Sequence, residues 1–307
     1  MNEKTFGEVY SSWKEAKKEF VKRSTLSVYT LLAEKHLLPT FGQRTDIRED
    51  DAQTLVLQKI SEGLSHKSVK DIMIVLKMVM RFGIKTGWAV NTEWDIKYPK
   101  EHRKQGLKVL TTSEQRRIMD FLAQHMSYRN LGIYICLSTG MRIGEICALK
   151  WSDINISDRV INVQRTIERI YITDADHRHT EVAEGPPKTV NSIREIPIGM
   201  QLIKMLRPIM KIVYHDAYIL TNDTKPLEPR LYHNYYNNMI RRHNLPRINF
   251  HGLRHSFATR CIESKCDYKT VSIILGHANI STTMNLYVHP GIDQKRKCID
   301  RMMRVLR

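Results

Sequence analysis

The hydrophobic pattern of the first third of the chain has a helical period. Apolar residues three and four positions apart share one face of a helix, and Pro39, Gly42 and Gly63 are expected to interrupt such faces. The pattern predicts helices over residues 6–21, 24–37, 48–60 and 65–86. We therefore expect residues 1–98 to form a small helical domain.

The helical period is lost near residue 98, where the chain becomes polar and basic. Such a segment is typical of a linker, which we place at residues 99–109. Thr111 and Glu114 then stand three positions apart, which is the spacing of a capping box at the start of a helix. A nearly continuous apolar run over residues 131–137 predicts a buried segment. A second domain is therefore expected over residues 110–290.

Alternating apolar and polar residues replace the helical period in the middle of the chain. Because successive side chains of a strand point to opposite faces, the alternation predicts strands over residues 160–163, 167–172 and 193–198. A polar excursion over residues 174–185 is expected to separate the second strand from the third. Residues 201–245 return to a helical pattern, with Pro208, Pro226 and Pro229 as interruptions. The predicted fold class is mainly α with a small antiparallel β-sheet.

The region after residue 250 is predicted to present polar side chains from consecutive short helices. On a helix over residues 251–261, His251, Arg254 and His255 share the face opposite an apolar stripe. A second helix is expected to run from Asp267, a favourable N-cap residue, to Gly276, a favourable terminator. His277 follows that helix directly, and Ser281 or Asn279 can cap a last helix that carries Tyr287.

Composition narrows the class of partner. The 307 residues suit two domains, and 49 Lys and Arg against 32 Asp and Glu give a net charge of +17. This charge favours nucleic acid or an anionic membrane surface. No apolar run approaches the roughly 18 residues of a spanning helix and the first residues are not a signal peptide, so nucleic acid is favoured over a membrane. Five cysteines without a Cys-x-x-Cys pair indicate neither a disulfide framework nor a zinc site, and they fit a reducing cytoplasm.

Two basic segments are candidates for DNA contact. On the helix over residues 65–86 a single face carries Lys67, Lys70, Lys77, Arg81 and Lys85. We expect this face to follow the phosphate backbone, although an ordinary solvated face has the same pattern. Arg241 and Arg242 lie in a basic aromatic cluster with several tyrosines. That cluster suits a DNA-facing helix and a half-buried helix equally.

The polar residues after position 250 suit a phosphodiester. Arginine offers a planar fork of donors to phosphate oxygens, neutral histidine donates or accepts one proton, and the phenol of Tyr287 is the only good covalent nucleophile of the set. The pattern His-x-x-Arg at residues 251–254, Leu-Gly-His ending at His277, and Thr-Thr-x-x-x-Tyr ending at Tyr287 resembles the tyrosine recombinase (phage integrase) family. A zinc pair at His251 and His255 is disfavoured because Gly252 stands where the zinc motif has Glu.

Two further segments carry the same resemblance. Thr-Gly-x-Arg-x-x-Glu at residues 139–145 implies that Arg142 is the first catalytic arginine and that Glu145 supports it, whereas a surface ion pair is the simpler alternative. Lys-Thr-x-x-Ser-x-Arg-x-x-Pro at residues 188–197 implies that Lys188 is the general acid, although a lysine in a hairpin is usually solvated. The resemblance covers about residues 108–290 closely and the helical first domain loosely.

The resemblance implies a helical core-binding domain and a catalytic domain that together clamp double-stranded DNA. It further implies that Tyr287 attacks a phosphate, that Arg142 and Arg254 stabilise its charge, that Lys188 protonates the leaving 5′-oxygen, and that His251 and His277 handle the tyrosyl proton and donate to the phosphate. No metal or other cofactor is required. Two alternatives remain open: a type IB topoisomerase-like nickase, and a DNA-binding regulator without catalysis.

The resemblance also implies an assembly. Four chains are expected to join on two sites made of short inverted repeats, as integration, excision or inversion of a DNA segment requires. Residues 291–307 have a helical pattern and are expected to dock on a neighbouring protomer, or alternatively on their own domain. Because the predicted core-binding helices already begin at residue 6, no separate arm-binding domain is expected if the chain is complete.

Overall fold

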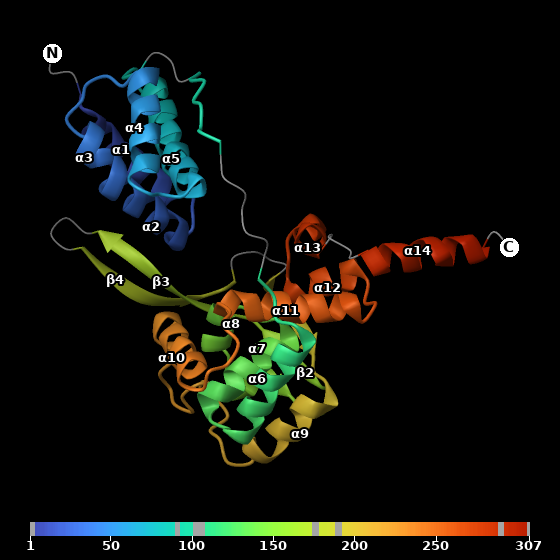
Figure 1. Ribbon diagram of the computed structural model, residues 1–307. Coiled ribbons are helices and arrows are strands. Elements are labelled where there is room, and N and C mark those ends of the chain that lie inside the picture. The colour runs from blue at the N-terminus through green and yellow to red at the C-terminus, as the bar shows by residue number, and fades with distance from the viewer. Residues whose placement is uncertain are drawn as a thin grey trace. The chain divides into compact units, whose positions relative to one another are not determined.

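The computed structural model describes residues 4–89, 93–100, 108–173, 178–187, 192–287 and 292–305 (Figure 1). The chain divides into two compact units. The first contains Met1–Gln105 and Arg169–Glu181, and the second contains Gly106–Glu168 and Val182–Arg307. The domain limits expected from the sequence, at residues 98, 110 and 290, stay predictions.

The first unit is a cluster of helices around an apolar core. Its helices are α1 (Phe6–Lys18), α2 (Arg23–Leu32), a π-helical turn (Ala33–Leu37), α3 (Leu38–Phe41), α4 (Glu49–Ser61) and α5 (His66–Lys85). Thr5 and Glu8 close a capping box at the start of α1, and the Ser65 side chain caps α5. One face of α5 is buried through Ile72, Leu76 and Val79, so the helical period read from the sequence corresponds to a buried face.

The break expected at Pro39 is wrong. Helical backbone continues through this residue, and the Leu38 amide donates to the Ala33 carbonyl five residues earlier. Proline lacks an amide hydrogen, and its ring collides with the carbonyl four residues before it in a regular helix. The wider π-turn just before Pro39 accommodates both effects, and the helix ends instead at Phe41, with Gly42 as its C-cap.

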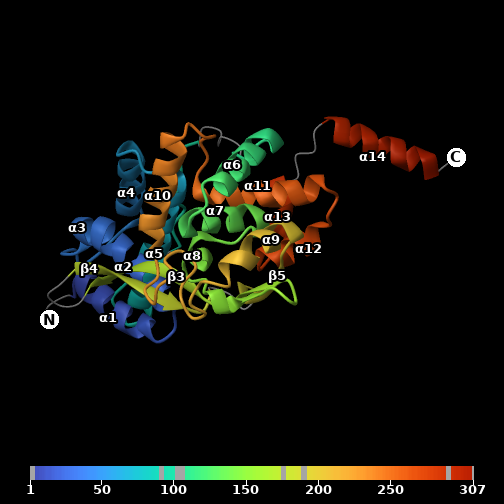
Figure 2. The same cartoon turned by 90° about the horizontal axis from the view of Figure 1, so that it is seen from below.

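The second unit holds the remaining helices, most of which pack around its own core. They are α6 (Thr112–Gln124), α7 (Tyr128–Thr139), α8 (Ile143–Cys147), the 3-10 turn Trp151–Asp153, α9 (Met200–Ile209), α10 (Pro229–Arg242), α11 (Phe250–Glu263), α12 (Tyr268–Leu275), α13 (Ile280–Tyr287) and α14 (Ile292–Val305). The predicted capping box is present, since the Glu114 carboxylate accepts from the Thr111 amide at 2.8 Å. Helix α7 is buried along most of its length and lies beside α11 (Figure 2).

A small antiparallel sheet has the strand order β1 (Ile154–Asn155), β2 (Val160–Val163) and β5 (Arg194–Pro197). Ile161 of β2 pairs with Ile196 of β5, and both side chains are buried. All three predicted strands are thus confirmed: residues 160–163 form β2, residues 193–198 contain β5, and residues 167–172 lie within β3 (Thr166–Thr173).

The polar excursion expected over residues 174–185 is wrong where the structure describes it. Residues Arg178–Gly185 form strand β4, which pairs with β3 in a separate two-stranded sheet. The described side chains of β4 are exposed or half-buried, and Val182 is 41% exposed. A strand without a buried face has no apolar alternation, so the pattern that reveals the other strands is missing here.

The helix expected throughout residues 201–245 is also wrong in its middle part. Helices α9 and α10 are separated by non-helical residues 210–228, and Pro229 occupies the first turn of α10. The apolar residues 217–220 of this non-helical stretch are buried, and the Ile219 amide donates to the Leu149 carbonyl at 2.9 Å.

Candidate active site

The turn between α7 and α8 places Arg142 and Glu145. Gly140 ends α7 in the left-handed conformation, with φ of 68°, and an added Cβ would meet the side chains of Phe257 and Leu275 within 3 Å. Only glycine suits this position. Arg142 then becomes the N-cap of α8, and its amide donates to Glu145 Oε2 at 2.8 Å. Its Nη1 donates to Glu145 Oε1 at 2.8 Å.

Arg254 reaches the same place from α11. Its side chain is buried, its Nη1 donates to the Gly140 carbonyl at 2.8 Å, and its Nη2 donates to the Leu275 carbonyl at 2.7 Å. Burial, followed by the positive charge of Arg142, lowers the pKa of Arg254 to about 9. The guanidinium therefore remains protonated at neutral pH. The structure brings Arg142 and Arg254 together, as the sequence predicted.

A third arginine joins them from β5. Both Nη atoms of Arg194 donate to the two oxygens of Glu145 at 3.0 Å, and its Nε donates to the Ile274 carbonyl at 2.6 Å. In the sequence, Arg194 is one residue of the Lys-Thr-x-x-Ser-x-Arg-x-x-Pro motif, and that motif alone indicates no role for it. We call Arg142, Arg194 and Arg254 the arginine cluster.

Glu145 is the carboxylate of the arginine cluster. Burial opposes its ionisation, but the hydrogen bonds and charges of Arg194 and Arg142 outweigh burial, so the pKa of Glu145 lies below its usual value. It is therefore ionised at neutral pH. Three positive charges and one negative charge lie together, which leaves an excess of positive charge for an anionic ligand.

The two predicted histidines lie near the arginine cluster. Gly276 ends α12 in the left-handed conformation, and His277 follows with its Nδ1 2.8 Å from Thr283 Oγ1. Burial, then Arg254 and Arg142, lowers the pKa of His277 to about 4. Burial and the same two arginines also lower the pKa of His251, whose ring is 4.5 Å from that of His255. The imidazole of His277 is thus neutral at pH 7.

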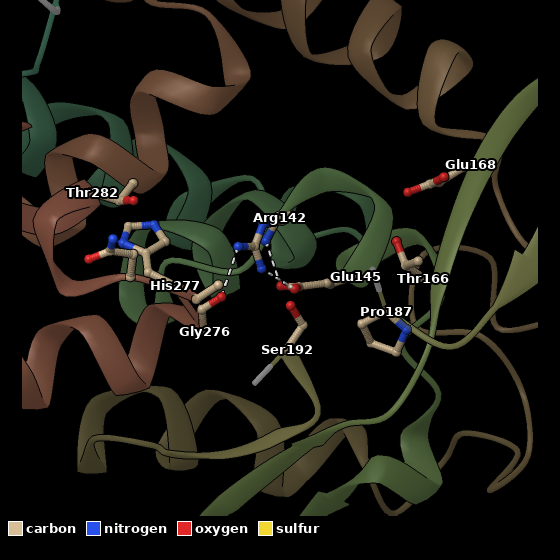
Figure 3. Close-up of a pocket in the computed structure, with 11 residues that line it drawn as sticks. Arg142, Glu145, Thr166, Glu168, Pro187, Ser192, Gly276, His277 and Thr282 are labelled. Atoms are coloured by element: carbon tan, nitrogen blue, oxygen red, sulfur yellow. Dashed lines mark hydrogen bonds and ion pairs between the residues drawn. The ribbon is translucent and has the colours of Figure 1, made fainter. Parts of the chain in front are cut away.

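A cavity of about 340 Å³ opens beside Arg142 (Figure 3). It is lined by Arg142, Glu145, Thr166, Glu168, Pro187, Ser192, Gly276, His277, Ala278, Asn279 and Thr282. Figure 3 shows Arg142 between His277 on one side and Pro187 and Thr166 on the other. The side chain of Arg142 is 36% exposed. The cavity can therefore admit an anionic group to a fixed guanidinium and a neutral imidazole.

Two predicted catalytic groups fall outside the described part of the chain. Lys188 lies outside the described residues. Tyr287 is the last residue of α13, and its side chain also lies outside the described set. The roles expected for both residues stay predictions.

The predicted DNA-binding residues are mostly exposed. In the first unit, the five α5 cations are Lys67, Lys70, Lys77, Arg81 and Lys85; all are exposed except the half-buried Lys77. Lys70 Nζ lies 5.3 Å from the centre of the Tyr98 ring. In the second unit, Arg241 and Arg242 are exposed in the last turn of α10, whereas Tyr232 and Tyr236 are buried. Those two tyrosines therefore serve the core.

The described residues meet neither the requirements of a membrane-spanning helix nor those of a metal site. No helix among them is long and apolar enough to cross a membrane. Within the same part of the chain, no group of His, Cys, Asp and Glu side chains is arranged to hold a metal ion.

Two family models match the chain. A model of the phage integrase family matches residues 108–292, which is more than half of the chain. A model of the N-terminal SAM-like domain of phage integrases matches residues 5–59.

Curated relatives are longer than this chain. A tyrosine recombinase XerC-like protein of Caldanaerobacter subterraneus subsp. tengcongensis is 28% identical over 264 residues, covering 78% of this chain and 67% of the relative. The transposase from transposon Tn916 of Enterococcus faecalis is 24% identical over 269 residues, covering 80% of this chain and 64% of the relative. The chain thus spans about two thirds of the length of these proteins.

Solved structures share the fold. The Tn1549 transposon integrase in complex with transposon right end DNA has a TM-score of 0.78 and 21% identity, covering 98% of this chain and 100% of that one. A lambda integrase tetramer bound to a Holliday junction has a TM-score of 0.66 and 20% identity, covering 93% and 78%. The likeness confirms the predicted fold class, a mainly helical protein with small antiparallel sheets.

Proposed function

Because the chain belongs to the phage integrase family, we propose that it is a site-specific DNA recombinase that cuts and rejoins duplex DNA through a 3′-phosphotyrosyl intermediate. The observation that carries this proposal is that Arg142 and His277 line one cavity, and that the buried Arg254 donates to the Leu275 carbonyl next to Gly276, which accepts from Arg142. A fixed excess of positive charge there suits the phosphate of a DNA backbone.

The proposed reaction is a transesterification. The phenolic oxygen of Tyr287 forms a bond to the scissile phosphorus, and the bond from phosphorus to the 5′-oxygen breaks. Lys188 gives its proton to the departing 5′-oxygen. Arg142 and Arg254 stabilise the charge on the nonbridging oxygens as the transition state forms. Attack of a 5′-hydroxyl on the phosphotyrosyl ester reverses the step and reseals the strand, so no external energy source is needed.

The histidines complete the proposed chemistry. A neutral imidazole can accept one proton and donate another, and the lowered pKa values of His251 and His277 favour that form at neutral pH. We propose that this pair of histidines accepts the proton of Tyr287 and donates a hydrogen bond to the phosphate. Their positions on α11 and directly after α12 bring both near Arg254.

The proposed substrate is a DNA segment bounded by short inverted repeats, as in a mobile element. The names of the Tn916 transposase and the Tn1549 transposon integrase support this choice. Residues 1–98 are proposed as the core-binding domain, 99–109 as the linker and 110–290 as the catalytic domain. The DNA contacts are assigned to the α5 cations and to Arg241 and Arg242. We place this activity on DNA in the cytoplasm.

A tetramer on two DNA sites is part of the proposal. In α14 the side chains of Ile299, Met302 and Met303 are about half exposed. A helix with such an apolar side favours docking on another surface, and exchange between four protomers gives a closed ring. Docking on its own domain is the alternative, and removal of residues 291–307 separates the two: loss of two-site pairing supports exchange.

A nicked suicide substrate tests whether the protein is an enzyme. Cleavage next to the nick releases a short strand, so religation fails and an active protein stays covalently attached to DNA. We expect a denaturant-stable complex with the wild type and none with Tyr287→Phe, at equal DNA binding. A protein that binds the site without becoming attached is a regulator rather than an enzyme.

A plasmid with two sites distinguishes a recombinase from a nickase. A recombinase yields deleted or inverted products, whereas a type IB topoisomerase-like nickase only relaxes the plasmid. Relaxation without exchanged products contradicts the proposed function while leaving the cleavage chemistry intact.

A further inference from the structure

The end of helix α12 is held by the whole arginine cluster. Three consecutive carbonyls accept hydrogen bonds from three different guanidinium groups: Ile274 from Arg194 at 2.6 Å, Leu275 from Arg254 at 2.7 Å, and Gly276 from Arg142 at 3.1 Å. The donors come from β5, from α11 and from the start of α8. Elements far apart in the sequence thus meet at one helical turn.

Helix chemistry explains why arginines gather there. The last carbonyls of a helix lack intrahelical partners, and the helix dipole gives this end a partial negative charge. Guanidinium groups satisfy the carbonyls and are stabilised by the dipole. His277 follows this turn directly, and its amide donates to the Ser272 carbonyl at 3.0 Å. The position of the imidazole therefore depends on the same contacts.

Arg194 and Arg142 share Glu145 unequally. The side chain of Arg194 is 5% exposed and meets both carboxylate oxygens with both Nη atoms, whereas the Arg142 side chain is 36% exposed and meets one oxygen with one Nη atom. A paired bidentate contact is the stronger of the two arrangements. Arg194 therefore balances the negative charge of Glu145, and the charge of Arg142 remains available at the cavity.

We propose that Arg194 is a positioning residue for the cleavage step: it neutralises Glu145 and fixes the end of α12, so that Arg142 presents an uncancelled positive charge to the scissile phosphate. This inference rests on the proposed function. Without Arg194, Glu145 has Arg142 as its remaining hydrogen-bonded arginine and cancels the charge that the phosphate needs.

The test compares Arg194→Met with a matched control, Arg165→Met. Arg165 also donates through both Nη atoms to both oxygens of one carboxylate, Asp153, in the same unit, at 3.0 and 3.2 Å. Its described hydrogen bonds and ion pairs join it to Asp153 and Glu184, neither of which lies in α12. Both variants remove a partly or fully buried guanidinium from a carboxylate, so loss of stability alone affects them alike.

The measurement is the single-turnover cleavage rate at saturating protein on two nicked substrates. One carries the ordinary scissile phosphate and the other a methylphosphonate, which has no charge to neutralise. With Arg194→Met we expect cleavage of the phosphate to slow by about 100-fold, the order seen when a transition-state donor is lost. Cleavage of the methylphosphonate should slow far less, and DNA affinity should stay unchanged. Arg165→Met should slow both substrates equally or neither.

A second variant tests the charge balance directly. Glu145→Gln combined with Arg194→Met removes the carboxylate that would cancel Arg142. We expect the double variant to cleave the phosphate faster than Arg194→Met alone. No such recovery, or an equal slowing of both substrates by Arg194→Met, overturns the proposal and leaves Arg194 a purely structural residue.

Two controls keep the outcomes separate. If the melting temperature shows that Arg194→Met is unfolded, Arg194→Lys is used in its place. Lysine keeps the positive charge but lacks the planar pair of Nη donors. We therefore expect a smaller loss of cleavage rate that is still selective for the phosphate substrate. An unselective loss or none contradicts the proposal. If the wild type forms no covalent complex, the proposed function fails; if the wild type and Arg194→Met form it at the same rate, only the role of Arg194 fails.

Discussion

The two units hold their positive charges in different ways. In the second unit the arginine cluster is fixed, since each guanidinium donates to backbone carbonyls or to Glu145 at 2.6–3.1 Å. In the first unit the α5 cations lie mostly in solvent on one helix face, with Lys70 over the Tyr98 ring as a local contact. Fixed charges suit a transition state, because no reorganisation is needed when charge develops. Solvated charges suit attraction to a polyanion and the release of counterions.

The difference predicts two kinds of mutational effect. Loss of a fixed charge should change the rate of the chemical step at unchanged affinity. Loss of a solvated charge should change affinity and its salt dependence at an unchanged rate. Arg254→Ala tests the fixed charges and Arg81→Ala tests the solvated ones, while Lys188→Ala and the pH dependence of stability concern proton chemistry in the second unit.

Arg254→Ala should have the largest effect. It removes a buried guanidinium and two hydrogen bonds that join Gly140 to Leu275. We expect the saturating cleavage rate to fall by up to about 1,000-fold, with DNA binding in a gel shift close to that of the wild type. Cleavage within a few-fold of the wild type at equal folding would remove Arg254 from the reaction.

Lys188→Ala should slow cleavage by about 100-fold through loss of the general acid. A substrate with a bridging 5′-phosphorothiolate needs no such acid, because sulfur leaves without a proton. The variant should therefore cleave the sulfur substrate nearly as fast as the wild type does. Equal slowing on both substrates would show that another residue supplies the proton.

Acid should destabilise the second unit through its buried histidines. Burial, then His251 and Arg254, lowers the pKa of His255 to about 4, below the ordinary value of 6.5. The unfolded chain therefore binds a proton more readily than the folded chain as the pH falls below 6.5, and stability is lost on the way down to pH 4. From pH 7 to pH 5 this one group should cost roughly 2 kcal/mol of unfolding free energy.

Urea unfolding at the two pH values measures that loss. His255→Gln removes the titrating group, so its unfolding free energy should change less between pH 7 and pH 5 than that of the wild type. An unchanged pH dependence in the variant would place the effect on other groups.

Arg81→Ala should have the smallest effect. It removes one exposed α5 cation, so binding should weaken by several-fold and the slope of log affinity against log salt should fall by about one. The saturating cleavage rate should not change. Arg48→Ala is the control, because Arg48 is also exposed in the first unit but pairs with Asp46; an equal change of slope in both variants would argue against a specific phosphate contact on α5.

The sequence could reveal features that repeat or stand at a fixed spacing. The face of α5 was predicted because its apolar residues recur with the helical period and are buried in the structure. The meeting of Arg142 with Arg254 was predicted from two motifs more than a hundred residues apart. In both cases several residues of one pattern support the same prediction, so the prediction does not depend on any single residue.

Features that leave no repeating pattern in the sequence, or that depend on contacts formed only in the folded chain, could not be predicted. Strand β4 has no buried face among its described residues, and hence no apolar alternation to detect. Arg194 matched a motif, but its proposed positioning role depends on its hydrogen bonds to Glu145 and to the Ile274 carbonyl. Only the folded chain brings these three residues together. Helical backbone at Pro39 depends on the π-helical turn Ala33–Leu37, which no residue type in that segment predicts.

The central claim is that Tyr287 becomes joined to the 3′-phosphate of cut DNA. Protein trapped on a nicked substrate can be digested with nuclease and trypsin, and the remaining nucleotide located by mass spectrometry. Cleavage after Lys269 and Lys295 gives one peptide in which Tyr287 is the only tyrosine, whereas Tyr268 falls in the preceding peptide. We expect a nucleotide joined through its 3′-phosphate to the phenolic oxygen of Tyr287. A nucleotide on Tyr268 or elsewhere, or trapped DNA with Tyr287 unmodified, would contradict it.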